Sequence, residues 1–143
     1  MLRIIAGIYL GMAGVMDWKK RRVSVKLSLA FLGLGILLWL QAPAFDWKVL
    51  AGGILVGICM LGVGKITGEA LGYGDGIAVA VTGCYLGFWQ NIELLLTALA
   101  LTAITGAVLL AVRRAGRKTQ LPFLPFLFAA HVLLFCLEWG YGR

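Results

Sequence analysis

The stretch Gly72-Tyr73-Gly74-Asp75-Gly76 stands where one long apolar segment gives way to another. A carboxylate inside a bilayer costs roughly 2.5–3.5 kcal/mol on insertion scales, so an acidic residue at such a junction is expected to serve a function. The other acidic residues expected on the same side of a membrane are Asp17 and Glu69. We interpret Asp17 and Asp75 as a candidate catalytic pair, with Glu69 as the rival second acid.

The composition predicts an integral membrane protein. Of the 143 residues, 62% are hydrophobic and the mean hydropathy is +0.96, whereas soluble domains are about 45–50% apolar. Short polar links separate the apolar runs, so we expect one membrane-embedded domain over residues 1–143. The first run lacks an Ala-x-Ala-like cleavage site and is interpreted as a retained helix.

Six apolar runs predict an all-α, polytopic bundle of six transmembrane helices. The first run would cover only about 20 Å of a hydrocarbon core roughly 30 Å thick, which draws Asp17 toward the membrane interface. Gln90, Asn91 and Glu93 are interpreted as the turn between the fourth and fifth runs. The predicted spans are residues 4–16, 27–42, 49–64, 76–92, 94–112 and 121–137.

The basic residues predict the orientation of this bundle. Six spans place ten of the thirteen Lys and Arg residues in the links after spans one, three and five. The positive-inside rule then puts both termini outside and Asp17, Glu69 and Asp75 on the cytoplasmic side. The net charge of +7 is accounted for by this topology, so we expect the lipid bilayer and not nucleic acid as a partner.

The remaining metal-ligating residue types predict neither a metal site nor a cofactor. Cys59, Cys84 and Cys136 are widely spaced within apolar runs and form no CxxC motif, which is typical of buried apolar thiols. The only histidine, His131, lies within a predicted span without an acidic or thiol neighbour at ligand spacing, and we expect a structural role for it.

A pair of carboxylates suits hydrolysis of a peptide bond without a metal. Two acids that share a poorly hydrated site cannot both ionise easily, so the pair holds one proton near neutral pH. The ionised acid takes a proton from water as it attacks, and the protonated acid polarises the carbonyl oxygen. Gly72, Gly74 and Gly76 either permit close approach of an extended substrate or merely break a helix.

The motifs resemble those of the GxGD membrane aspartic proteases, specifically the type IV prepilin and preflagellin peptidases. Gly72-Tyr73-Gly74-Asp75 is similar to the motif with the second catalytic aspartate, and Asp17, followed by basic residues and Val23-Ser24, resembles the first. The stretch 121–127 is similar to a proline-phenylalanine motif at the last span. The lining residues implied are Gly72, Gly74, Gly76, Glu69, Pro122, Phe123, Pro125 and Phe126.

The resemblance implies a multi-pass enzyme of a prokaryotic plasma (inner) membrane with its active site facing the cytoplasm. It would cleave basic leaders from prepilin-like precursors, such as Tad-type pilins or flagellin-like proteins. Ile77 and Ser24 depart from the family pattern, which usually has lysine and proline there. The paired CxxC motifs and methyltransferase region of longer members are not found in these 143 residues, so the resemblance is to the small, peptidase-only forms.

Two other functions remain open on the sequence. A small transporter or channel component could use Asp17 and Asp75 to bind a proton or cation at a broken helix. Such a protein should offer polar groups near the membrane midplane, whereas a peptidase needs both acids at one face. A non-catalytic assembly protein is the other alternative.

Overall fold

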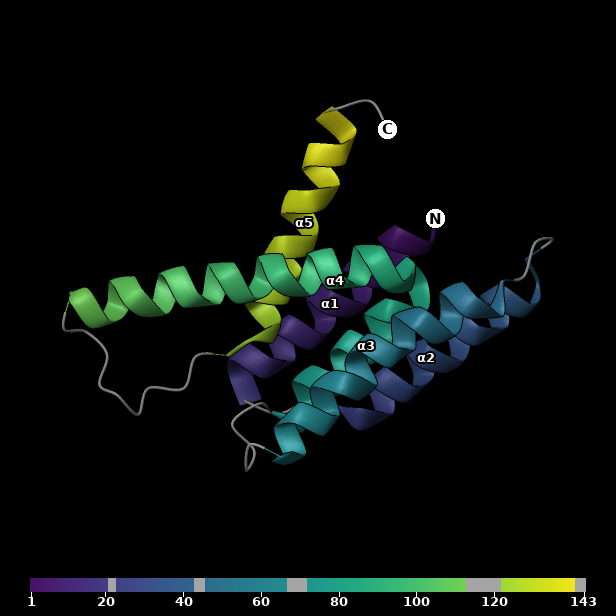
Figure 1. Cartoon of the computed structure of the whole chain (residues 1–143), viewed down its shortest axis with the longest axis horizontal. Helices are drawn as coiled ribbons and strands as arrows, with labels where there is room; N and C mark the ends of the chain where they lie inside the picture. The colour runs from purple at the N-terminus through teal and green to yellow at the C-terminus, as the bar shows by residue number, and fades with distance from the viewer. Residues whose placement is uncertain (21–22, 43–45, 67–71, 113–121, 141–143) are drawn as a thin grey trace.

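A computed structural model describes residues 1–20, 23–42, 46–66, 72–112 and 122–140. In these ranges the chain is all helical, without strands. Two helices, α3 and α4, are long and apolar enough to cross a membrane, and α2 and α5 are shorter apolar helices. The helices are α1 (Leu2–Lys20), α2 (Val25–Leu40), α3 (Trp47–Ile66), α4 (Tyr73–Ala111) and α5 (Leu124–Gly140) (Figure 1).

The sequence placed a turn at Gln90–Glu93, and the structure shows that this was wrong. Those residues stay helical within α4, and the chain bends at Gly87, whose φ of 76° and ψ of −173° are not helical. This backbone conformation is essentially confined to glycine. The region of the fourth and fifth predicted spans thus forms two arms of α4, residues 73–86 and 88–111, which are divided at Gly87 and not at Gln90–Glu93. The second arm turns away at the bend (Figure 1).

Asn91 explains why the polar residues do not form the turn. Its side-chain amide is fully buried and donates to the carbonyl oxygens of Val79 at 2.9 Å and Gly53 at 3.1 Å. Thr82 donates to Asn91 Oδ1 at 2.9 Å. Asn91 thus ties the second arm of α4 to the first arm and to α3, so its polarity is satisfied inside the fold.

The first arm of α4 packs very closely against α3. A Cβ added to Gly53 would lie 2.0 Å from the carbonyl oxygen of Gly83, and one added to Gly57 would lie 2.2 Å from the backbone nitrogen of Ala80. Small residues at four-residue spacing permit such backbone approach between membrane helices. The glycines at positions 53, 57 and 83 therefore let α3 and the first arm of α4 approach closely.

The other face of this arm contacts α2. Trp39 Nε1 donates to the carbonyl oxygen of Cys84 at 2.7 Å, and the hydroxyl of Tyr85 donates to the carbonyl oxygen of Phe31. Gly35 leaves room for this contact, since an added Cβ would lie 2.7 Å from Cys84 Sγ. The helix that begins with the Gly-x-Gly-Asp motif is therefore held between α2 and α3.

Helix α1 packs antiparallel to α5. Gly7 faces the ring of His131, Gly11 faces Phe128, and Gly14 faces the backbone of Pro125. The beginning of α1 consequently lies beside the end of α5, and the end of α1, which carries Asp17, lies toward the beginning of α5.

Candidate active site

Asp17 lies in the last turn of α1 and is buried, with 8% of its surface exposed. Helix α1 turns Ala6, Leu10 and Ala13 into the core. Asp17 therefore continues the buried face of an otherwise apolar helix, although it is ionisable. A buried carboxylate of this kind is a candidate functional group.

Asp75 lies in the first turn of α4, directly ahead of the predicted span 76–92. Gly72 is the N-cap residue, and the Asp75 amide donates to the Gly72 carbonyl oxygen at 3.0 Å. Burial is the largest cause that raises the pKa of the Asp75 carboxyl from 3.8 to about 6, and the charge of Asp17 raises it further. A hydrogen bond from the Gly72 backbone opposes this rise by stabilising the carboxylate.

This electrostatic interaction shows that the fold brings the two aspartates to one site. They are far apart in the sequence and come from different helix ends, since Asp17 closes α1 and Asp75 opens α4. Two carboxyls that interact in this way, one of them with a raised pKa, can hold a single proton between them. Such a pair supplies a base and an acid together.

The glycines around Asp75 differ in their surroundings. Gly72 is exposed. A Cβ added to Gly74 would lie 2.5 Å from Val23 Cγ2, and one added to Gly76 would lie 2.6 Å from Leu61 Cδ2. The chain itself therefore covers Gly74 and Gly76, which lets the start of α4 sit close to the α1–α2 link and to α3.

Ser24, one of the departures from the family pattern, has a structural role. It is the N-cap residue of α2, and its hydroxyl accepts from the amide of Leu27 at 3.4 Å. Sequence reasoning overlooked this role, although a serine directly before an apolar run is a known signature of a helix start. The contacts of Val23 with Gly74 and of Leu61 with Gly76 have no comparable signature in the sequence.

The proline-phenylalanine stretch begins α5 near the Asp17 end of α1. Phe123 and Leu124 are buried, and Pro122, Pro125 and Phe126 are partly buried. The Phe123 carbonyl oxygen accepts from the amides of Phe126 and Leu127, both at 3.0 Å. Pro125 packs against Gly14, three residues before Asp17 and so about 4.5 Å from it along the helix axis.

Glu69, the rival second acid, lies outside the described residues, as do the basic residues 21–22 and 113–118. In the ranges that the structure describes, no three His, Cys, Asp or Glu side chains gather in a way that could hold a metal ion. Of the three candidate acids, the structure therefore describes Asp17 and Asp75.

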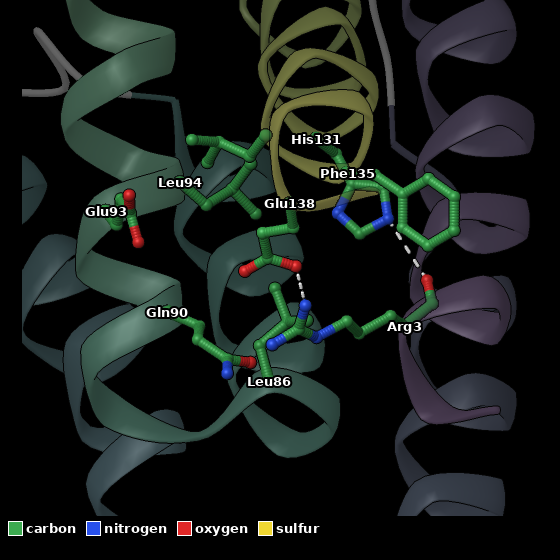
Figure 2. Close-up of a pocket in the computed structure, with 9 residues that line it drawn as sticks. Arg3, Leu86, Gln90, Glu93, Leu94, His131, Phe135 and Glu138 are labelled. Carbon is green, nitrogen blue, oxygen red and sulfur yellow. Dashed lines mark hydrogen bonds and ion pairs between the residues drawn. The ribbon is translucent and has the colours of Figure 1, made fainter. Parts of the chain in front are cut away.

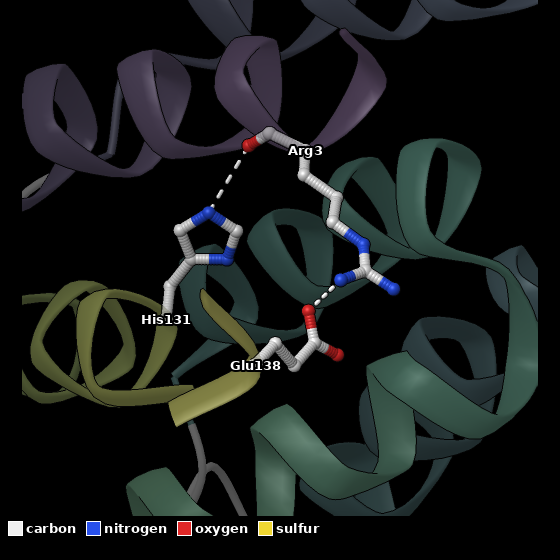
Figure 3. Close-up of polar contacts among 3 residues, drawn as sticks. All are labelled: Arg3, His131 and Glu138. Atoms are coloured by element: carbon white, nitrogen blue, oxygen red, sulfur yellow. Dashed lines mark hydrogen bonds and ion pairs between the residues drawn. The ribbon is translucent and has the colours of Figure 1, made fainter. Parts of the chain in front are cut away.

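A second polar cluster lies at the opposite end of α1. Figure 2 shows a small cavity, about 30 Å³ in volume, at which Arg3, Gln90, Glu93, His131 and Glu138 meet. Arg3 forms an ion pair with Glu138, and its carbonyl oxygen lies 3.0 Å from His131 Nε2 (Figure 3). Asp17 follows Arg3 by fourteen positions, about 21 Å along the helix, so this cluster is distinct from the aspartate pair.

Comparison with known proteins identifies the family of the chain. A family model described as the type IV leader peptidase family matches residues 4–111. The matched range includes Asp17 and the motif around Asp75 and ends before the proline-phenylalanine stretch. No curated protein and no solved structure matches the chain. Because the match spans most of the sequence, the chain belongs to the type IV leader peptidase family, whose members are membrane proteins.

Proposed function

We propose that this protein is an aspartic endopeptidase that removes basic leaders from type IV prepilin-like precursors, with Asp17 and Asp75 as its catalytic residues. The observation that carries the proposal is the electrostatic coupling of the two acids, in which the charge of Asp17 raises the pKa of Asp75. Membership of a leader peptidase family supplies the reaction class, and the pair supplies a chemistry for it.

The pair performs hydrolysis by moving two protons. The ionised acid accepts a proton from water while the water oxygen bonds to the carbonyl carbon of the scissile peptide. The protonated acid donates a hydrogen bond to the carbonyl oxygen and stabilises the negative charge that develops there. When the tetrahedral intermediate collapses, the C–N bond breaks and the amine leaves with a proton from the pair.

The same proposal includes the topology. Six spans, formed by α1, α2, α3, the two arms of α4 and α5, would put both termini outside and the pair at the cytoplasmic face of a prokaryotic plasma membrane. The contact of Arg3 with Glu138 supports an even number of crossings, since it holds the beginning of α1 beside the end of α5. Tad-type pilins and flagellin-like proteins are the proposed substrates because their basic leaders precede an apolar helix.

The transporter alternative is less well supported by the buried polar groups. Tyr9 and Ser28 are hydrogen-bonded to each other at 2.9 Å, and Thr82 and Asn91 are bonded to each other and to backbone carbonyls. In the described ranges these groups are satisfied by the chain itself. A transport site would instead present its oxygens to the ion.

Cleavage of a prepilin-like substrate by the full chain, reconstituted in lipid, tests the proposal. Asp17→Asn, Asp75→Asn and the double variant should be almost equally inactive, because two residues that act as one unit give grossly non-additive losses. Asp46→Asn, at the opposite membrane face in the proposed topology, is the matched control and should cleave normally.

Two results would change the assignment. Retained cleavage in Asp17→Asn together with complete loss in Glu69→Gln would replace Asp17 by Glu69. Retained cleavage in Asp75→Asn would end the aspartic peptidase proposal.

A further inference from the structure

Val23 occupies the space that a side chain at position 74 would need. A Cβ added to Gly74 would lie 2.5 Å from Val23 Cγ2 and 3.0 Å from Val23 Cβ, and the first of these distances is far inside ordinary van der Waals contact. Gly74 does not have the positive φ of Gly87. Its lack of a side chain therefore serves close packing and not an unusual backbone conformation.

Val23 is itself held in place by helices α2 and α1. It directly precedes Ser24, whose hydroxyl caps α2 and whose carbonyl oxygen accepts from the amide of Ser28 at 3.0 Å. The Ser28 hydroxyl is hydrogen-bonded to the Tyr9 hydroxyl of α1 at 2.9 Å, in a buried position. The end of the α1–α2 link is thus fixed to the same helix that carries Asp17.

The opposite side of the α4 start is closed by α3. A Cβ added to Gly76 would lie 2.6 Å from Leu61 Cδ2 and 3.2 Å from the Leu61 backbone nitrogen. The first turn of α4, which carries Asp75, is therefore held between Val23 and Leu61. A methyl group added at Gly74 would meet Val23 while Leu61 covers the other side of the α4 start, so the added group would press Val23 away from α4.

We propose that Val23, seated on Gly74, is a positioning residue that sets the separation of Asp17 from Asp75. This inference rests on the proposed function, and it assigns a task to Gly74 other than contact with substrate. Val23 stands three residues after Lys20, the last residue of α1, and the hydrogen bond of Ser28 with Tyr9 joins the start of α2 to α1. A displacement of Val23 is therefore passed to the helix that carries Asp17. A misplacement of about 1 Å can cost roughly a hundredfold in rate.

A double-mutant cycle in the reconstituted cleavage assay tests this contact. Gly74→Ala should lower kcat roughly a hundredfold in the wild-type background but less than about threefold in the Val23→Gly background, because the space is then free. Gly62→Ala, where an added Cβ meets nothing within 4 Å, is the matched control and should cleave like wild type. Equal losses in both backgrounds would overturn the inference.

The pH dependence of kcat separates an effect on positioning from a loss of folded protein. In Gly74→Ala the alkaline limb of the kcat profile should move to lower pH, because Asp17, the charge that acts on Asp75, then lies further away. A smaller folded fraction would scale the whole profile and leave the limb in place, which would contradict the inference.

Val23→Gly alone introduces no clash and keeps the test decisive if Gly74→Ala does not fold. It should lower kcat by roughly tenfold, and a wild-type rate in Val23→Gly would overturn the inference. Cleavage by the wild type and none by Asp75→Asn would still support the proposed function even if Val23 proved to have no positioning role. The positioning inference and the proposed function can therefore fail separately.

Discussion

Asn91 donates its side-chain amide to the carbonyl oxygen of Val79 at 2.9 Å, across the bend at Gly87. The same amide reaches Gly53 of α3, so one buried side chain joins both arms of α4 to the neighbouring helix. The bend supplies the break between two predicted spans without a polar loop, and a satisfied amide stabilises it.

Replacing Asn91 by leucine should destabilise the protein without changing its aspartates. The carbonyl oxygens of Val79 and Gly53 would lose the amide donor, and an unsatisfied buried polar group costs about 1–3 kcal/mol. We expect a lower thermal unfolding temperature for the purified protein in detergent. Thr97→Val is the control, because the Thr97 hydroxyl is exposed and bonds only within its own helix turn. Equal unfolding temperatures for the two variants would contradict the role of Asn91.

The sequence predicted much of this fold because ionisable residues are conspicuous among apolar ones. Asp17 and Asp75 stand out in this way. The turn at Asn91 was misplaced because polarity was taken as a sign of exposure, whereas here the polar group is buried and paired. Gly87 was available as a helix breaker, but only the packed structure shows which glycine adopts a positive φ.

The close contacts at the motif could not be predicted in the same manner. Val23 and Leu61 are ordinary apolar residues, and nothing in their local sequence indicates that they cover Gly74 and Gly76. Such contacts depend on how helices distant in the sequence approach each other, which periodicity does not specify. By contrast, the capping role of Ser24 could have been predicted from the known sequence signals of a helix start.

The raised pKa of Asp75 predicts how the stability of the protein depends on pH. The carboxyl has a pKa of about 6 when folded and 3.8 as its ordinary value, so the folded state binds the proton more tightly. Its stabilising contribution is complete below about pH 3.8 and is lost as the pH rises through 6. Asp75→Asn, which cannot ionise, should therefore unfold at a higher temperature than wild type at pH 8.

The advantage of Asp75→Asn should shrink as the pH falls toward 4, because wild-type Asp75 is then also neutral. Thermal unfolding in detergent at pH 4.5 and pH 8 checks this difference, and Asp46→Asn serves as the control. The opposite result is an Asp75→Asn variant that is less stable than wild type at pH 8, with a larger deficit there than at pH 4.5. That result would contradict the proposed burial of the Asp75 charge.

The proposed topology predicts which positions can be labelled from outside the cell. Single cysteines introduced at Lys20 and Arg114, in a background with Cys59, Cys84 and Cys136 replaced by alanine, should be protected from a membrane-impermeant thiol reagent in intact cells. They should react once the membrane is opened. A cysteine at Lys48, on the outer side in the proposed topology, should react in intact cells. Labelling of positions 20 and 114 from outside would reverse the orientation and move the aspartate pair to the outer face.

The two ends of α1 should respond differently to mutation, since one carries the aspartate pair and the other the Arg3 cluster. His131→Ala removes the ring that lies against Gly7 and the contact with the Arg3 carbonyl oxygen, about 21 Å along the helix from Asp17. We expect it to lower the unfolding temperature, because His131 is buried and its hydrogen bond contributes about 1 kcal/mol. It should leave kcat/KM within about threefold of wild type, because the contact with Arg3 lies far from the aspartate pair. Phe126→Ala and Pro122→Ala change the opposite end, where α5 begins beside the turn that leads to Asp17, and should lower kcat/KM by at least about tenfold if they line the active site.

Measuring cleavage and unfolding on the same preparations separates the two effects. Loss of cleavage in His131→Ala, with normal cleavage in both Phe126→Ala and Pro122→Ala, would show that the reaction depends on the Arg3 end of the bundle and that both assignments are wrong.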